Sequence, residues 1–223
     1  MELKNILIDS VDKLNDIYGL PTVNPLVTVF DLNHATRPPL SFARVTYGLY
    51  VVFLKNLPNC SLLYGRHSYD FKAGTVVSLS PGQTVGVLEP AVKTASRDVR
   101  GIAFHPDLIY GTPLADKIAA FSFFDFADLE ALHLSDGERA VVIDCLDKIK
   151  GEMQHVADRH SQTILTANIY LLLEYLHRFY DRQFQTRHKA NSNVVHRFEQ
   201  SLRAYFTYGD RGYPTVGYFA AEA

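Results

Sequence analysis

The side chains best suited to holding a small molecule lie on residues that the sequence places in or beside β-strands. They combine aromatic rings, a guanidinium and an imidazole: Arg44, Tyr50, Phe53, Tyr64, Tyr69 and His105. Aromatic walls with a few polar groups are the usual lining of ligand pockets. Each residue alone is also an ordinary core or surface residue of a β-protein, and His105 fits a simple strand exit. We therefore expect a binding pocket only from the group as a whole.

The spacing of the polar residues does not match a metal centre or a catalytic site. Metal sites in small β-barrels need two or three histidines and a carboxylate, whereas the nine histidines here lie mostly singly. A polar break at 158–160 separates His155 from His160. The sequence also lacks a Gly-x-Ser-x-Gly elbow, a phosphate-binding loop and a dinucleotide fingerprint. We therefore expect no catalytic residues, no metal and no cofactor.

The overall composition excludes further classes of function. The chain has 223 residues and a formal net charge of −2, which argues against a broad nucleic-acid-binding surface. Two cysteines, Cys60 and Cys145, form no disulfide framework, so we expect a reducing compartment. No apolar run is long enough to cross a membrane, and the first residues lack the pattern of a secretion signal. A cytoplasmic protein is the expectation.

The elements that must position the candidate ligand-binding residues are short strands in the first half of the chain. Residues 62–83 contain three short runs rich in aromatic and β-branched residues, separated by turns that contain glycine. Further strands are expected at 26–32, 41–54, 84–88 and 98–104, with a turn at 55–60. Gly48, inside the longest run, predicts a bulge or bend. Seven or eight short strands predict an antiparallel β-barrel whose mouth can hold one ligand.

Helical patterns flank the strands. Residues 3–18 predict a short helix with Ser10 as a cap, and Thr112 with Pro113 predicts another over 112–121. Ser135 and Glu138 fit a capping box. The helix that follows this box carries apolar residues at 4-3-4-3 spacing: Val142, Leu146, Ile149, Met153 and Val156. Two more helices are expected, at 161–184 and 193–208.

The helix expected at 161–184 has apolar residues on two sides. One side is an a/d seam with 4-3-4-3 spacing, formed by Leu165, Ile169, Leu172, Leu176 and Phe179. Other apolar residues, among them Ile164, Leu171 and Tyr175, lie off this seam. A helix that is apolar on two sides needs a second partner, either the barrel of the same chain or another subunit. We assign the seam to the interface of a homodimer.

Several stretches together resemble the N-terminal, cupin-like sensing region of AraC-type transcriptional regulators. The matching stretches are KAGTVVSLSPGQ at 72–83, AFHPDLIYGT at 103–112, FYDRQF at 179–184 and PTVGYFAAEA at 214–223. The resemblance covers nearly the whole chain. It implies an α+β fold, in which a cupin-like antiparallel β-barrel of the jelly-roll type precedes a helical dimerisation segment.

The resemblance also implies a division of the chain. Residues 1–24 would form an N-terminal arm, 25–108 the sensor barrel, 109–208 the dimerisation helices, and 209–223 a linker with the start of a helix-turn-helix domain. Because the last expected helix stops soon after its cap at Thr215, we expect a fragment of a longer bacterial protein that contacts DNA only through the missing domain. Sugar-binding members use aromatic and histidine side chains on the last barrel strand. Residues 99–103 offer none, so no sugar site is inferred.

The function implied by the resemblance is to sense a small-molecule effector and to pair two subunits. Three alternatives stay open at this point. The first is a cupin-type metalloenzyme, which stoichiometric bound metal would indicate. The second is a small-molecule-binding barrel without a regulatory role. The third is a barrel that has lost its ligand and serves only as a dimer scaffold.

Overall fold

The computed structural model describes residues 4–38, 40, 42–55, 60–64, 67–71, 74–87, 98–124 and 131–207. For 60–64, 67–71 and 185–207 the description covers the backbone and not the side chains. The chain divides into two compact units, Met1–Phe179 and Tyr180–Ala223. The linker and helix start expected at 209–223 lie outside the described residues.

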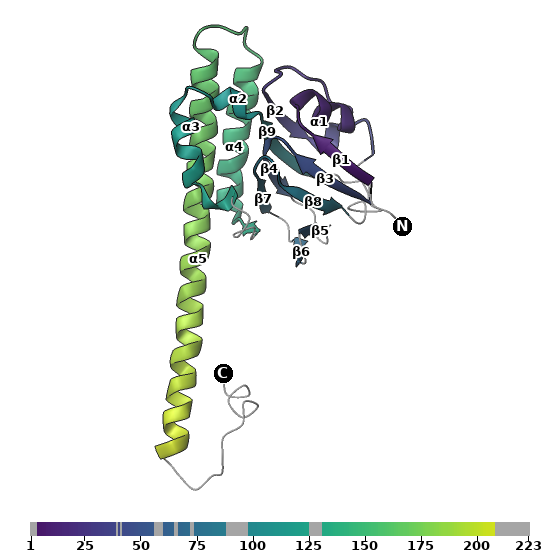
Figure 1. Ribbon diagram of the computed structural model, residues 1–223. Helices are drawn as coiled ribbons and strands as arrows, with labels where there is room; N and C mark the ends of the chain where they lie inside the picture. The colour runs from purple at the N-terminus through teal and green to yellow at the C-terminus, as the bar shows by residue number, and fades with distance from the viewer. Residues whose placement is uncertain are drawn as a thin grey trace. The chain divides into compact units, whose positions relative to one another are not determined.

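The first unit is built on two five-stranded sheets (Figure 1). In strand order, sheet A consists of β1 (Lys4–Ile8), β3 (Ala43–Tyr47), β8 (Thr84–Val87), β5 (Cys60–Tyr64) and β6 (His67–Phe71). Sheet B consists of β10 (Leu132–His133), β7 (Thr75–Leu79), β4 (Tyr50–Lys55), β9 (Val99–Phe104) and β2 (Val27–Asp31). The pairing is antiparallel except between β1 and β3, which are parallel. This arrangement confirms an α+β fold with mostly antiparallel sheets.

The first strand was not expected from the sequence. Residues 3–18 are not one helix, because Lys4–Ile8 pairs along β3 as β1 and only Val11–Tyr18 forms helix α1. The cap at Ser10 is confirmed: its hydroxyl accepts a hydrogen bond from the backbone N–H of Lys13 at 3.3 Å. The helix ends at Gly19, which adopts a left-handed conformation with φ of 66°. Tertiary pairing with β3 thus decides the conformation of Lys4–Ile8.

The long run at 41–54 is two strands in different sheets. The chain leaves sheet A after Tyr47 and enters sheet B at Tyr50. At this crossing the N–H of Gly48 donates to the carbonyl of Ile8 at 2.7 Å, and a Cβ atom on Gly48 would lie 3.0 Å from Asp9 Cα. The predicted bend at Gly48 is therefore confirmed, and it is sharp enough to move the chain between sheets.

The two sheets share one hydrophobic core. It is formed by alternate residues of facing strands, together with Val11, Leu14 and Tyr18 of α1. The alternation expected along 41–54 is maintained across the crossing, because every second residue is buried in this core: Val45, Tyr47, Leu49, Val51 and Phe53. A row of inward-facing apolar residues thus passes from one sheet to the other.

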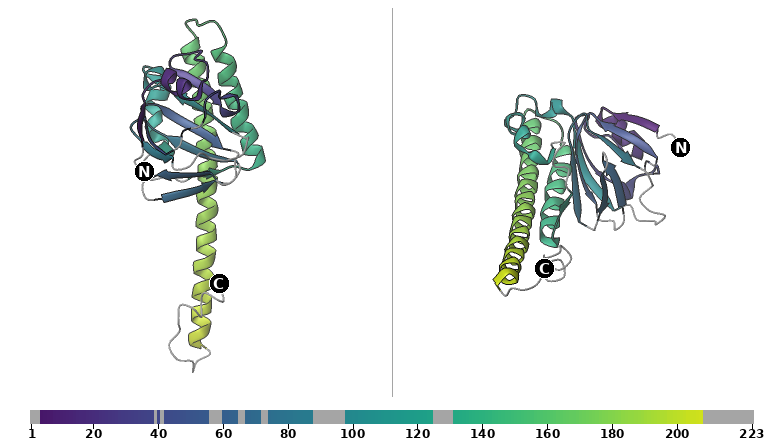
Figure 2. Two further views of the ribbon diagram at one scale, coloured as in Figure 1. Left: turned by 90° about the vertical axis from the view of Figure 1, so that its right-hand side faces the viewer. Right: turned by 60° about the horizontal axis from the view of Figure 1, so that its bottom comes forward.

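Helices cover the outer face of sheet B. They are α2 (Pro106–Ile109), α3 (Pro113–Lys117), the 3₁₀ turns η2 (Ile118–Ala120) and η3 (Ser122–Phe124), α4 (Asp136–Met153) and the first part of α5 (Ser161–Thr207). Figures 1 and 2 show α4 between sheet B and α5. The capping box at α4 is confirmed by two bonds, Ser135 N to Glu138 Oε2 at 2.8 Å and Glu138 N to Ser135 Oγ at 3.4 Å. No helix in the described part of the chain is long and apolar enough to cross a bilayer.

Helix α5 differs from expectation in two ways. It runs unbroken over 161–207 instead of forming two helices, because the intervening 185–192 contains neither glycine nor proline. Its a/d seam is also buried within the single chain: Leu165, Ile169, Leu172 and Leu176 are at most 3% exposed, and Phe179 is 7% exposed. These residues therefore do not form an open surface for a second subunit.

Candidate functional site

The inner face of sheet B presents its side chains in rows that run across the strands. The register places Leu79, Val51 and Ala103 in one row, then Val77, Phe53 and Gly101, then Thr75, Lys55 and Val99. Alternation along each strand points all three rows toward sheet A. The first two rows are apolar, whereas the third carries an ammonium and a hydroxyl. We call Lys55 and Thr75 the polar row.

The interior is closed by α1 at the end away from the polar row. Residues Val11, Leu14 and Tyr18 of α1 belong to the same buried core as Leu49 and Val51. Tyr18 is hydrogen-bonded to Tyr47 of β3. Burial raises the pKa of Tyr18 to about 12 and the pKa of Tyr47 well above 10, so both phenols stay neutral at physiological pH.

An aromatic wall lies between this closed end and the polar row. Its rings are Phe30 of β2, Phe53 of β4 and Tyr47 of β3, with centroids 5.5 Å apart for Phe30 and Phe53 and 6.1 Å apart for Tyr47 and Phe53. Gly101 makes room for it, because a Cβ atom there would lie 2.6 Å from Phe30 Cζ. The absence of a side chain on β9 thus lets the ring of Phe30 lie against the strand.

The polar row is buried. Lys55 is 6% exposed and Thr75 is fully buried. Lysine is among the residues least often buried, since removing an ammonium from water is costly. Thr75 Oγ1 lies 3.3 Å from Nδ1 of His133 on the neighbouring strand β10. A cation and a hydroxyl next to aromatic rings are groups that can bind and orient an amphipathic small molecule.

The structure does not bring the six expected ligand-binding residues together. Phe53 lies in the interior, whereas Tyr50 lies on the opposite face of β4 and stacks on Phe104 with centroids 5.1 Å apart. Arg44 is exposed on β3. His105 caps α2, its Nδ1 accepting from the N–H of Asp107 at 3.2 Å, which supports the strand-exit interpretation. Tyr64 and Tyr69 lie in β5 and β6, and their side chains are outside the described set.

A second candidate is a cavity of about 280 Å³ between the outer face of sheet B and the start of α4. Its lining consists of three apolar residues and four charged ones: Leu54, Ala140, Ile143, Asp98, Arg100, Asp136 and Arg139. Arg100 pairs with Asp31 at 3.2 Å and Arg139 pairs with Asp136 at 3.4 Å. Because each guanidinium already faces a carboxylate, this cavity has no single charge to offer a ligand. It is the weaker candidate.

Metal binding finds no support in the side chains that the structure describes. No three of their histidine, cysteine, aspartate or glutamate residues gather where they could hold an ion.

Comparisons with known proteins add no family. No model of a known protein family matches the sequence, and no curated protein matches it significantly. The resemblance to AraC-type regulators therefore depends on the sequence motifs alone.

Sequence reasoning missed the polar row because it placed Lys55 in the turn at 55–60. The strand is one residue longer than expected, since Lys55 pairs with both Thr75 and Val99. If the alternation of Val51 and Phe53 is continued by two residues along the strand, it predicts that Lys55 points inward. Phe30 was missed because its role depends on Gly101, which is distant in sequence.

Proposed function

We propose that this chain is the ligand-sensing and dimerisation part of an AraC-type transcription regulator, with a cupin-like jelly-roll sensor and a DNA-binding domain beyond the residues given. The observation that carries the proposal is the graded interior of the two-sheet unit. It is closed and apolar at α1, aromatic at Phe53 and polar at Lys55. Such an interior is suited to a small molecule with one polar end.

The helices are coupled to the outer face of the same sheet. In the connection that follows β7, Gln83 is fully buried and its Nε2 donates to the carbonyl of Phe124 in η3 at 2.8 Å. Tyr50 meets the ring of Phe124 edge to face, with centroids 5.1 Å apart. Phe53 on the inner face and Tyr50 on the outer face belong to one strand, β4. A ligand beside Phe53 could change the position of the helices only if it binds one arrangement of β4 more tightly than another. The size of that difference in affinity limits how far it shifts the equilibrium between the two arrangements.

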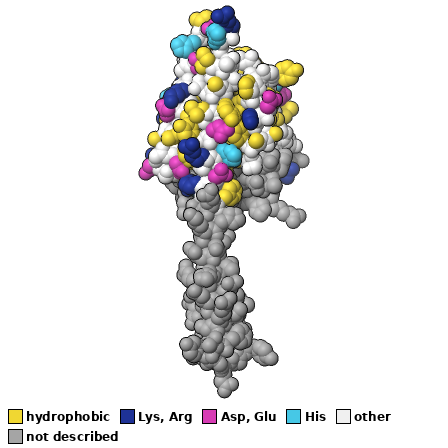
Figure 3. All heavy atoms as spheres, turned by 90° about the vertical axis from the view of Figure 1, so that its left-hand side faces the viewer, with side chains coloured by type: hydrophobic (Ala, Val, Ile, Leu, Met, Phe, Trp, Pro, Cys, Tyr) yellow, Lys and Arg dark blue, Asp and Glu magenta, His cyan; other side chains and the backbone are white. Residues whose placement is uncertain are grey.

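The proposed homodimer needs a surface other than the buried seam of α5. On another side of this helix Ile164 and Leu171 are 42% and 41% exposed. Arg178 lies 5.7 Å above the ring of Tyr175 on the same side. Figure 3 shows hydrophobic side chains lying among charged ones on the face formed by the helices. This mixed composition is typical of interfaces that form between folded subunits.

A thermal-shift screen with metabolites tests the sensing role. A ligand present at about one hundred times its Kd should raise the Tm by roughly 5–10 °C. In the variant Val77→Phe, which narrows the interior beside Phe53, the same ligand should raise the Tm much less. Tyr110→Phe, changed at a residue that is 84% exposed, is the matched control and should respond like the natural chain.

Two results would contradict the proposal. One is a ligand that stabilises Val77→Phe and the natural chain equally, since it would bind elsewhere. The other is stoichiometric iron, zinc, manganese or nickel in the purified protein, which would favour the cupin-type metalloenzyme.

A further inference from the structure

The cavity between sheet B and the start of α4 has walls that carry opposite charges. Leu54 and Arg100 line it from neighbouring strands of the sheet, and Asp136 and Ile143 line it from the helix. Both sheet residues lie on the outer face, because they alternate along β4 and β9 with the residues of the shared core. The cavity is thus separate from the interior between the two sheets. Its volume of about 280 Å³ lies just below the usual range for drug-sized ligands and suits a smaller molecule.

Arg100 has nitrogen atoms available for an anion. Its Nε lies 3.2 Å from Oδ2 of Asp31, and its side chain is 42% exposed. Among the residues whose surroundings the structure describes, neither of its terminal nitrogens, Nη1 and Nη2, has a hydrogen-bond partner. These two nitrogens form the fork that binds a carboxylate through two parallel hydrogen bonds. The ion pair with Asp31 therefore positions the guanidinium and leaves its fork open.

Asp136 provides a carboxylate on the other wall. It is the first residue of α4, and its Oδ1 lies 3.4 Å from Nη2 of Arg139. Its Oδ2 has no hydrogen-bond partner in the described part of the chain, and a carboxylate can accept further hydrogen bonds. Asp98 adds a second carboxylate to the lining. With two arginines and two aspartates, the lining carries both signs of charge and no net charge.

We infer that this cavity binds a zwitterion, an α-amino acid with an apolar side chain. The fork of Arg100 binds the carboxylate, and Asp136 accepts a hydrogen bond from the ammonium. Three apolar residues, Leu54, Ala140 and Ile143, provide area for the side chain. The balanced charges of the lining disfavour a simple anion or a simple cation, since either would meet a like charge. The inference concerns a second site and does not rest on the proposed sensing function.

The experiment removes one charge of the ligand at a time. L-leucine is compared with isopentylamine, which lacks the carboxylate, and with isocaproate, which lacks the ammonium. L-valine is compared in the same way with isobutylamine and isovalerate. Binding to residues 1–223 is measured by calorimetry at neutral pH and constant ionic strength. We expect at least one amino acid to bind at least about tenfold more tightly than both of its singly charged counterparts.

Three variants assign the binding to this cavity. Arg100→Gln should abolish the preference for the amino acid over the amine, because it removes the partner of the carboxylate. Asp136→Asn should abolish the preference over the acid, because it removes the partner of the ammonium. Ala140→Phe, changed at an exposed position of α4, fills the cavity and should weaken the binding of the amino acid at least about tenfold.

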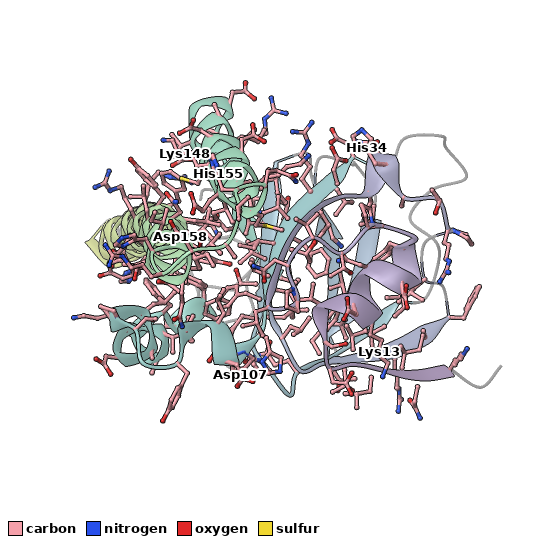
Figure 4. The ribbon with its side chains drawn as sticks, turned by 90° about the horizontal axis from the view of Figure 1, so that it is seen from above. Lys13, His34, Asp107, Lys148, His155 and Asp158 are labelled. Atoms are coloured by element: carbon pink, nitrogen blue, oxygen red, sulfur yellow. The ribbon has the colours of Figure 1, made fainter. Side chains whose placement is uncertain are left out.

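The matched controls are Arg159→Gln and Asp144→Asn, which remove exposed charges of the same kind elsewhere. Asp144 pairs with Lys148 of α4, which lies at the surface (Figure 4). Neither change should alter the affinity for the amino acid or its preference over the amine and the acid.

Several results would overturn the inference. They are no binding of either amino acid, equal binding of an amino acid and its singly charged counterparts, and an unchanged preference in folded Arg100→Gln or Asp136→Asn. If Arg100→Gln does not fold because it loses the ion pair with Asp31, then Asp136→Asn and Ala140→Phe decide, since both positions are exposed.

The test also separates this cavity from the interior proposed for sensing. Val77→Phe, which narrows that interior, should leave the affinity for the amino acid unchanged. In the metabolite screen, a compound that is lost in Ala140→Phe and kept in Val77→Phe is assigned to this cavity. The sensing role is then judged on the compounds that Ala140→Phe does not affect.

Discussion

At the scale of single residues, the buried pair of Tyr18 and Tyr47 links the end of α1 to sheet A. Both hydroxyls lie in the apolar core, where ionisation of either phenol would place a negative charge out of water. The pair therefore makes the fold sensitive to alkaline pH.

We expect the free energy of unfolding to fall as the pH rises from about 10 to 12. In this range the unfolded chain releases the phenolic proton of Tyr18, with a pKa of 10.0, while the folded chain keeps it up to a pKa of about 12. The folded state thus holds more protons, so stability is full below pH 10 and is lost at up to about 1.4 kcal/mol per pH unit. Denaturant unfolding at several pH values measures the slope.

The control for this prediction is Tyr18→Phe, which removes the titrating phenol. In this variant the free energy of unfolding should fall less steeply with pH than in the natural chain. Tyr110→Phe should leave the slope unchanged, since Tyr110 is exposed. An equal slope in Tyr18→Phe and the natural chain would show that other groups cause the alkaline loss.

Several single-residue roles could be predicted from the sequence and others could not. The caps at Ser10 and Ser135 are local, because each depends on backbone groups within three residues. The roles of Gly101 and Lys55 are set by strands far away in sequence, β2 for Gly101 and β7 for Lys55. The residues next to Gly101 and Lys55 in the sequence do not reveal which distant strand will pack against them.

At the scale of elements, α5 shows how one apolar pattern serves different ends. Spacing alone predicted an a/d seam, and the spacing was right, but it could not tell a partner in the same chain from a second subunit. The structure buries Leu172 and leaves its neighbour Leu171 41% exposed. Adjacent leucines on one helix thus provide a matched pair.

We expect Leu172→Asp to lower the free energy of unfolding by about 3 kcal/mol or more, because it buries an unpaired charge in the core of one chain. Leu171→Asp should change it by about 0.5 kcal/mol or less. Thermal unfolding followed by circular dichroism measures both. Similar Tm values for the two variants would show that the seam is not buried in solution.

Sedimentation of Leu171→Asp gives separate information on the proposed dimer. Loss of dimers in this folded variant would place the subunit contact on the exposed side of α5. Dimers that persist unchanged would place it on another surface.

The strands were easier to locate than to assign to sheets. Composition and turns placed β2, β8 and β9 within one or two residues. The division of 41–54 between two sheets depends on the contact of Gly48 with Ile8, which strand propensity does not record. The two-residue β10 is too short to show a pattern, and it exists because it pairs with β7.

At the scale of the whole molecule, the fold class followed from many short strands and a later change of period to helices. The function did not follow from the fold, because a two-sheet core with helices on one face suits many activities. The proposal of a regulator therefore needs a test of pairing in the complete chain.

We expect residues 1–223, fused to a DNA-binding domain that occupies its operator only as a pair, to repress a reporter gene in cells. The chain by itself should shift no DNA in a gel, because its net charge is −2 and no basic surface is expected. The control is the same DNA-binding domain without the chain, which should leave the reporter active. Repression equal to that control would argue against the dimerisation role.

The parallel pairing of β1 with β3 has a practical consequence. The five residues Lys4–Ile8 form the edge strand of sheet A and pair with the backbone of β3 on the side away from β8. A recombinant fragment shortened past Ile8 would expose that row of amides and carbonyls as a template for aggregation. Expression boundaries for this protein should therefore be set upstream of Lys4, and an affinity tag is better attached through a spacer that leaves this strand free to pair.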